Sequence, residues 1–223
     1  MLKAVLFDMD GLLVDTEKLL SRFWCEAAQS FGFPMTKEHV LGIRSLSWKF
    51  AAPHLKGIFG EDFDYAAVRA KRIELMNAYI AENGVEMKAG LIELLDHLDR
   101  LGLKRAVCTA TDHERTERYL TSIGVYHRFD AFVCGDMIAN GKPMPDTYIE
   151  GAKAVGCEPG ECMALEDSPN GIESAYRAGC IPVMVPDLSQ PDEELMKKLR
   201  AVCSDLAEVR TVIDELLSMC APT

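Results

Sequence analysis

The chain has 223 residues, of which 48% are hydrophobic and 26% are charged. This is an ordinary globular composition, and it excludes a disordered, collagen-like or multi-spanning membrane protein. The 24 basic and 35 acidic residues give a net charge of −11. Because binding to phosphate backbones and anionic membranes depends on basic residues, we expect neither nucleic acid nor a membrane as a partner.

The eight cysteines are scattered, with no C-x-x-C pair and no zinc-like spacing to histidine. A chain of this length buries roughly 70% of its unfolded surface and needs no disulfides to hold a core. The sequence shows no signal peptide and no apolar stretch of the ~20 residues that a membrane helix requires. We therefore expect reduced cysteines and a monomer located in the cytoplasm.

The first predicted element is a short buried strand over residues 3–7, which leads into acidic residues and Gly11. Asp15 or Thr16 is then expected to cap a helix, whose apolar residues repeat at helical spacing as far as Gly32. From there to about residue 83 the sequence reads as helices, with no strand-like run.

After residue 84 the pattern changes to alternating strands and helices. Strands are expected at residues 105–108, 131–134, 162–165 and 181–185, with helices between them and a mostly helical tail over 193–217. This alternation is typical of an α/β fold with a doubly wound parallel sheet. Because the all-helical stretch interrupts it, we predict a discontinuous core domain, residues 1–15 and 84–223, with an inserted helical cap domain, residues 16–83.

Polar side chains follow the ends of several predicted strands. The carboxyl ends of parallel strands meet at one edge of a sheet, where ligands bind. We therefore expect these side chains to share one crevice. They are Asp8 and Asp10 after the first strand, Thr109 after the second, Glu166 and Asp167 after the strand at 162–165, and Lys142 in a turn just before a helix.

This set of residue types suits the transfer of a phosphoryl group. Clustered carboxylates repel one another unless a cation neutralises them, and Mg²⁺ prefers oxygen ligands and accepts a substrate phosphate beside them. The Lys142 ammonium and the Thr109 hydroxyl can donate to the remaining phosphate oxygens. One aspartate can attack phosphorus to form an aspartyl phosphate, while a second carboxylate on the same loop protonates the leaving oxygen.

These motifs resemble those of the haloacid dehalogenase superfamily, in particular the subgroup with β-phosphoglucomutase and sugar-phosphate phosphatases. The matching segments are Asp8-Met-Asp-Gly-Leu-Leu-Val-Asp-Thr16, Thr109, Lys142-Pro and Leu165-Glu-Asp-Ser-Pro-Asn-Gly171. All four motifs occur in the family's order and span nearly the whole chain. The resemblance implies a Rossmann-like core with a helical cap inserted after the first strand.

The resemblance also implies a role for each motif residue. Asp8 would be the nucleophile and Asp10 the general acid and base, while Thr109 and Lys142 would hold the phosphoryl group. Mg²⁺ would be bound by the Asp8 carboxylate, the Asp10 backbone carbonyl and Asp167, with Glu166 as a further ligand or support. From their places in the sequence, Ala110 and Arg44 are candidate substrate contacts, with a surface charge as the alternative for Arg44, and Asn170 either caps a helix or lies near the metal.

The leading hypothesis is a Mg²⁺-dependent phosphatase acting on a small phosphorylated metabolite such as a sugar phosphate. One alternative is a β-phosphoglucomutase-like mutase with the same intermediate, and another is a catalytically silent protein that binds phosphorylated metabolites. Mutases of that family carry a histidine in the first cap helix, where this chain has Leu20. The clustered charges of the motifs argue against a silent protein, since such charges are costly to bury.

Overall fold

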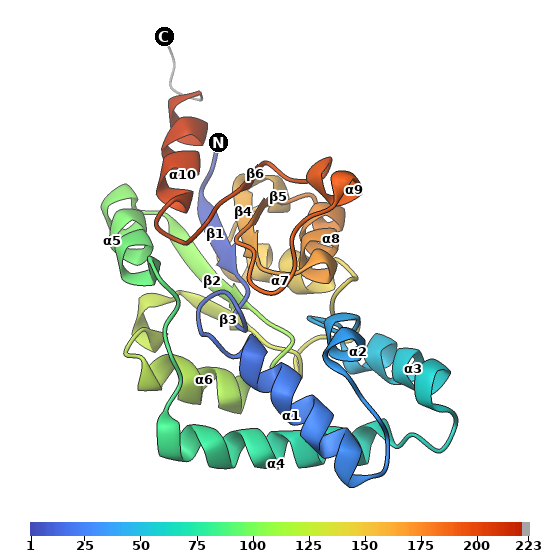
Figure 1. Ribbon diagram of the computed structural model, residues 1–223. Helices are drawn as coiled ribbons and strands as arrows, with labels where there is room; N and C mark the ends of the chain where they lie inside the picture. The colour runs from blue at the N-terminus through green and yellow to red at the C-terminus, as the bar shows by residue number, and fades with distance from the viewer. Residues whose placement is uncertain (220–223) are drawn as a thin grey trace.

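A parallel sheet of six strands forms the centre of the structure (Figure 1). The computed structural model describes residues 1–219, and the strand order is β3-β2-β1-β4-β5-β6. All neighbouring strands are parallel, which confirms the predicted α/β class with a doubly wound sheet. The strands are β1 (Ala4–Phe7), β2 (Lys104–Cys108), β3 (Ala131–Val133), β4 (Cys162–Glu166), β5 (Ile181–Met184) and β6 (Ala201–Val202).

Helices cover both faces of this sheet, which explains why the central strands are apolar throughout. In β1, Val5 and Phe7 join the hydrophobic cluster on one face, and Ala4 and Leu6 join the cluster on the other, as side chains of a strand alternate. The first face is covered by α5 (Leu91–Leu101), α6 (His113–Ser122) and α10 (Val209–Ser218), and the second by α7 (Asp146–Ala154) and α8 (Pro169–Ala178).

Four further helices form what we call the helical unit, between β1 and α5. They are α1 (Glu17–Ser30), α2 (Lys37–Leu41), α3 (Trp48–Phe59) and α4 (Tyr65–Asn83). The unit has a hydrophobic cluster of its own, which includes Trp24, Leu55 and Phe63. In Figure 1, α1 and α4 lie side by side beyond the carboxyl ends of the strands. The division of the chain into a core and a cap domain stays a prediction.

The predicted helical tail over residues 193–217 is wrong in its middle. A short helix, α9 (Glu193–Met196), is followed by β6, which pairs in parallel with β5 before α10 begins. The backbone N–H of Arg200 donates to the Pro182 carbonyl, and that of Cys203 donates to the Met184 carbonyl. Pairing along the sheet edge therefore creates a strand that is too short to leave a pattern in the sequence.

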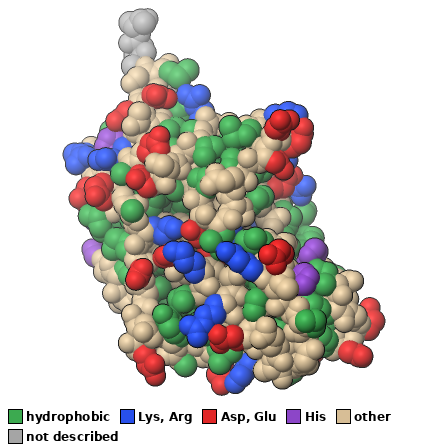
Figure 2. All heavy atoms as spheres, viewed as in Figure 1, with side chains coloured by type: hydrophobic (Ala, Val, Ile, Leu, Met, Phe, Trp, Pro, Cys, Tyr) green, Lys and Arg blue, Asp and Glu red, His purple; other side chains and the backbone are tan. Residues whose placement is uncertain are grey.

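Seven of the eight cysteines lie in the described residues and are free thiols, as expected, while Cys220 lies outside those residues. Within residues 1–219, no helix combines the length and the apolar character that crossing a bilayer requires. Although the chain is acidic overall, Figure 2 shows several Lys and Arg side chains where the helical unit meets the rest of the molecule.

Candidate active site

The loop after β1 brings Asp8 and Asp10 to the carboxyl edge of the sheet. Asp8 follows directly after β1 and is buried. Gly11 then turns the chain with φ +81°, and a Cβ atom at this position would lie 2.2 Å from Asp167 Oδ2. Glycine is needed here both for the backbone conformation and for the close approach of the β1 loop to the β4 loop.

Lys142 lies between two of the predicted site carboxylates. Its Nζ atom is 2.7 Å from Asp8 Oδ1 and 2.5 Å from Glu166 Oε1, and the side chain is fully buried. The Tyr148 hydroxyl donates to the same Glu166 oxygen at 2.6 Å. Burial alone would lower the pKa of Lys142, but Asp8 and Glu166 together raise it above its ordinary value. Lys142 therefore remains a cation that partly neutralises the cluster.

Asp8, Glu166 and Asp167 form a group that suits a divalent cation. Each offers a carboxylate oxygen, and these oxygens all lie within 4.8 Å of one another. Burial raises the pKa of Asp167, and it raises the pKa of Asp8 to about 7 with a contribution from Glu166. Asp167 Oδ1 is buried without a hydrogen-bond partner. A hard cation with oxygen ligands would satisfy this atom and relieve the repulsion, so the residues fit Mg²⁺.

The Asp10 carboxylate is held by two hydroxyl groups. Thr16 Oγ1 donates to Asp10 Oδ1 at 2.6 Å, and Thr111 Oγ1 donates to Asp10 Oδ2 at 2.7 Å. As predicted, Thr16 is the N-cap residue of α1, but its side chain forms no capping hydrogen bond because its hydroxyl donates to Asp10. Both oxygens of Asp10 are thus fixed in direction at the edge of a pocket.

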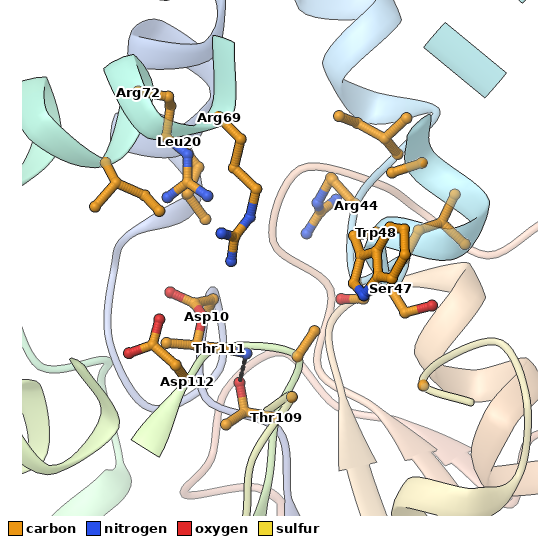
Figure 3. Close-up of a pocket in the computed structure, with 18 of the residues that line it drawn as sticks. Asp10, Leu20, Arg44, Ser47, Trp48, Arg69, Arg72, Thr109, Thr111 and Asp112 are labelled. Atoms are coloured by element: carbon orange, nitrogen blue, oxygen red, sulfur yellow. Dashed lines mark hydrogen bonds between the residues drawn. The ribbon is translucent and has the colours of Figure 1, made fainter. Parts of the chain in front are cut away.

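Thr109 and Ala110 lie at the end of β2 and line the same pocket as Asp8 and Asp10. Thr109 is buried, and its Oγ1 atom accepts a hydrogen bond from the backbone N–H of Thr111 at 3.1 Å (Figure 3). The structure thus brings all the predicted strand-end residues to one place. Their roles in catalysis stay predictions.

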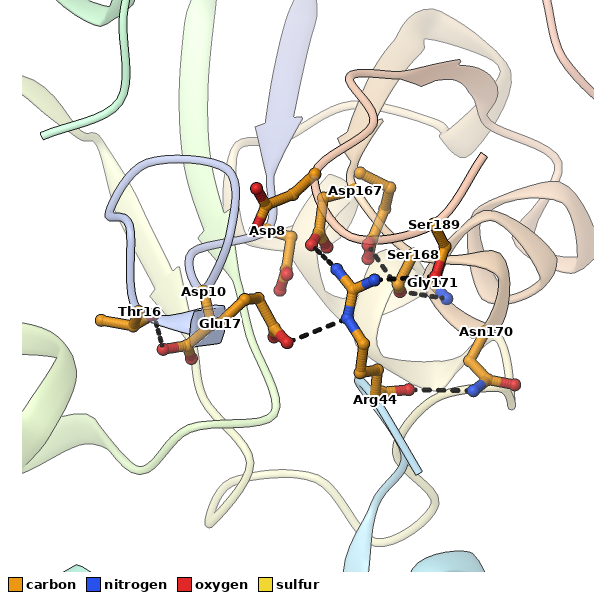
Figure 4. Close-up of polar contacts among 12 residues, drawn as sticks. Asp8, Asp10, Thr16, Glu17, Arg44, Asp167, Ser168, Asn170, Gly171 and Ser189 are labelled. Carbon is orange, nitrogen blue, oxygen red and sulfur yellow. Dashed lines mark hydrogen bonds and ion pairs between the residues drawn. The ribbon is translucent and has the colours of Figure 1, made fainter. Parts of the chain in front are cut away.

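Arg44 comes from the segment after α2 and reaches toward Asp167 in the loop after β4 (Figure 4). Its Nε atom forms an ion pair with Glu17 Oε2 at 2.9 Å, and its Nη2 atom pairs with Asp167. Its Nη1 atom donates to Ser189 Oγ at 2.9 Å. Arg44 lines the pocket, as a substrate contact would, but its guanidinium already pairs with two carboxylates of the protein. In this arrangement Arg44 links the helical unit to a predicted metal ligand.

Asn170 supports Arg44 and does not cap α8. The N-cap residue is Ser168, whose hydroxyl oxygen accepts from the Gly171 backbone N–H at 3.1 Å. Asn170 Nδ2 instead donates to the Arg44 backbone carbonyl at 2.9 Å. The capping alternative for Asn170 is therefore wrong. The N-cap position lies two residues earlier, at Ser168, and this leaves the Asn170 amide to contact the helical unit.

A pocket of about 610 Å³ separates the sheet edge from the helical unit. Sequence reasoning missed several side chains at or near it, because each is brought there by tertiary packing. Thr111 could have been suspected from its place two residues after Thr109. The others are Thr16, Glu17 and Tyr148, which contact predicted site residues, and Arg69 and Arg72 of α4, which line the pocket (Figure 3).

The buried carboxyls predict how the stability of the metal-free protein depends on pH. Burial raises the pKa of Asp8 from 3.8 to about 7 and that of Glu17 from 4.5 to about 8. On raising the pH, the unfolded chain loses these protons first, while the folded protein still holds them. The free energy of unfolding is therefore expected to fall between about pH 5 and pH 8.

Thermal unfolding in excess EDTA across this range checks the expectation. Added Mg²⁺ should raise the melting temperature more at pH 8 than at pH 5, because metal ligands must be ionised. Asp8→Asn removes one titrating group, so its metal-free melting temperature should vary less with pH than that of the wild type. A wild-type melting temperature that increases steadily from pH 5 to pH 8 in EDTA would contradict the prediction.

Comparison with known proteins agrees with this geometry. The family model described as haloacid dehalogenase-like hydrolase matches residues 5–185. Hexitol phosphatase A of Escherichia coli (strain K12) is 33% identical over 184 residues, which is 82% of each chain. The crystal structure of CbbY from Rhodobacter sphaeroides in complex with phosphate is 27% identical, with a TM-score of 0.78 over 94% of this chain and 96% of that chain.

A β-phosphoglucomutase from Clostridium difficile has a TM-score of 0.82 over 96% of both chains. At 22% identity, this likeness shows a shared fold alone. The family model, in contrast, covers both the loop after β1 and the loop after β4, which carry the carboxylate cluster. The chain therefore belongs to the haloacid dehalogenase-like hydrolase family.

Proposed function

We propose that this protein is a phosphoric monoester hydrolase that cleaves a sugar phosphate or a similar small phosphorylated metabolite. The observation that carries this proposal is the buried Asp8, which lies beside the Lys142 ammonium and two further carboxylates at the edge of a pocket. The similarity to a hexitol phosphatase supports this substrate class. The proposal extends to Mg²⁺ as cofactor and to an aspartyl-phosphate intermediate.

In the first half of the reaction, a carboxylate oxygen of Asp8 attacks phosphorus and the bond from phosphorus to the ester oxygen breaks. Asp10 gives its proton to the leaving alcohol. Lys142 and Thr109 bind oxygens of the transferred phosphoryl group. Mg²⁺, held by Asp8, Asp167, Glu166 and the Asp10 carbonyl, would offset the negative charge that the phosphoryl group brings to the carboxylates.

In the second half, water attacks the phosphorus of the aspartyl phosphate, and its proton passes to the ionised Asp10. Asp8 is regenerated and inorganic phosphate leaves. The Thr16 and Thr111 hydroxyls hold the two Asp10 oxygens in place for both proton transfers. The helical unit, as the predicted cap over residues 16–83, would shield the intermediate from bulk water.

A mutase is the second candidate, because the fold also matches that of a β-phosphoglucomutase. A mutase must keep water from the aspartyl phosphate until a sugar hydroxyl attacks it. The first helix of the helical unit contributes the apolar Leu20 to the pocket, and Leu20 can neither carry nor gate a proton. This favours hydrolysis. Incubation with β-glucose 1-phosphate distinguishes the two reactions. A mutase would accumulate glucose 6-phosphate only when glucose 1,6-bisphosphate is added, whereas a phosphatase would release inorganic phosphate.

The proposed function predicts phosphate release that depends on Mg²⁺. A panel of sugar, polyol and nucleoside monophosphates would be incubated with the enzyme in Mg²⁺, in EDTA and in Ca²⁺, and inorganic phosphate measured. We expect activity on sugar or polyol phosphates that is lost in EDTA, restored by Mg²⁺ and little restored by Ca²⁺, which prefers longer bonds and more ligands. Full activity in EDTA would refute the proposed dependence on Mg²⁺. The absence of phosphate release from every ester would refute the proposed hydrolase activity.

A further inference from the structure

Two arginines of α4, Arg69 and Arg72, line the pocket from the helical unit. A spacing of three residues places both side chains on one face of the helix. In Figure 3 they extend from α4 toward the space above Asp10, Thr109 and Thr111. The pocket therefore has acidic and hydroxyl groups on the sheet side and guanidinium groups on the opposite wall.

Arg72 is a buried cation without an anionic partner in the described chain. Its side chain is 5% exposed, its Nε atom has no hydrogen-bond partner, and its Nη1 atom contacts the Met76 sulfur at 3.9 Å. Burial and the nearby Arg115 and Arg69 lower its pKa to about 10, so it is still protonated at neutral pH. Burying such a charge is costly unless an opposite charge meets it.

The other buried guanidinium groups of the pocket differ from Arg72 because each forms an ion pair with at least one carboxylate. Arg44 pairs with Glu17 and Asp167, and Arg115 Nε is 2.7 Å from Asp112 Oδ2. The carboxylate of Asp10 is already held by two hydroxyl groups. The Trp24 ring lies 5.3 Å from the Arg72 guanidinium carbon, but no carboxylate of the described residues forms an ion pair with Arg72. The pocket therefore leaves this cation open to an anion on a molecule that enters it.

We propose that Arg69 and Arg72 form a second anion site, and that the preferred substrate is a phosphomonoester with another phosphate or a carboxylate at its far end. This inference rests on the proposed function, because it assigns the transferred phosphoryl group to Asp8, Thr109 and Lys142. A pocket of about 610 Å³ has room for a six-carbon chain charged at both ends. Guanidinium groups suit both kinds of anion, because their paired N–H groups match two oxygens.

A matched series of substrates tests the proposal. Sorbitol 6-phosphate, 6-phosphogluconate and sorbitol 1,6-bisphosphate share an open six-carbon chain and differ at carbon 1, which carries a hydroxyl, a carboxylate or a phosphate. We expect kcat/KM to be about 10- to 100-fold higher for at least one of the doubly charged compounds than for sorbitol 6-phosphate. The compound with the higher kcat/KM shows whether the preferred second anion is a carboxylate or a phosphate.

Variants then assign this preference to the two arginines. Arg72→Met and Arg69→Met should each lower kcat/KM for the doubly charged compounds more than for sorbitol 6-phosphate and so remove most of the preference, and Arg72→Lys should keep part of it. Lys71→Met is the matched control, since Lys71 belongs to the same helix, loses the same charge and pairs with Glu74 instead of lining the pocket. Lys71→Met should leave the ratio between substrates unchanged.

Binding to the Asp8→Asn protein gives a readout that does not depend on turnover. Calorimetric titration should show tighter binding of a doubly charged compound than of sorbitol 6-phosphate, and Arg72→Met in the same background should abolish the difference. Equal kcat/KM and equal affinity across the series would overturn the second anion site while phosphate release still supported the hydrolase. An equal loss on all three substrates in both arginine variants would also overturn it, since that marks a structural role.

Discussion

Asp8→Asn is expected to abolish turnover and to leave the fold intact. An amide oxygen is a poor nucleophile toward phosphorus, so no aspartyl phosphate can form. The same oxygen can still accept the hydrogen bond from Lys142 Nζ, which keeps its second partner, Glu166. Because the substitution also removes a buried charge beside Glu166 and Asp167, we expect the melting temperature to be unchanged or higher.

Phosphate release from 4-nitrophenyl phosphate and from the best metabolite substrate measures the loss of turnover, and thermal unfolding measures stability. Asp130→Asn is the matched control, because Asp130 also pairs with a lysine, Lys104, but lies at the opposite edge of the sheet before β3. The control should keep wild-type activity. A purified Asp8→Asn protein with wild-type turnover would refute Asp8 as the nucleophile.

The sheet and the position of the site could be predicted because both leave local signals. A buried parallel strand is a short apolar run, and all five predicted strands begin and end within one residue of observed strands, while the two-residue β6 was missed. Once the strands are known, the topology itself collects their carboxyl ends at one edge. Asp8, Thr109 and Glu166 could therefore be placed together without knowledge of any contact.

The contacts made by the helical unit could not be predicted in this way. Arg44 is 123 residues from Asp167, and their pairing depends on how four helices pack over the sheet. Arg72 gave no signal either, since an arginine on an amphipathic helix is ordinarily a surface charge. Its burial follows from the packing of α4 against α1 and from the Trp24 ring, which lies 5.3 Å from its guanidinium carbon.

The position of Lys142 could be predicted from the sequence in part only. Its place before a helix predicted a phosphate contact, and the structure adds the two carboxylates that hold it. Gly171 shows why the surrounding sequence is restricted, because a Cβ atom there would lie 1.9 Å from the Glu166 carboxyl carbon. The first turn of α8 thus leaves room for the carboxylate that Lys142 and Tyr148 both contact.

Asp10→Asn is expected to lower turnover by about 10²- to 10⁴-fold, the usual contribution of general acid and base catalysis. An asparagine can keep the contacts of the aspartate, since its oxygen accepts from one threonine hydroxyl and its amide can donate to the other. The loss should therefore come from proton transfer and not from a displaced side chain. An unchanged melting temperature would support this.

The two half-reactions should respond differently to the leaving group. Formation of the aspartyl phosphate from 4-nitrophenyl phosphate needs little protonation of the leaving oxygen, so Asp10→Asn should slow it less than the same step with a sugar phosphate. Attack by water still requires a base. The variant should therefore release one equivalent of 4-nitrophenol rapidly and then turn over slowly, as rapid-mixing measurements would show.

Thr111→Val provides the control for orientation, since it removes one hydroxyl that holds Asp10 and leaves the carboxylate in place. We expect a smaller loss of turnover than in Asp10→Asn and no burst of 4-nitrophenol. An equal slowing of phosphoenzyme formation for good and poor leaving groups in Asp10→Asn would count against Asp10 as the general acid. In that case its two hydroxyl contacts would mark a carboxylate that shapes the β1 loop without transferring a proton.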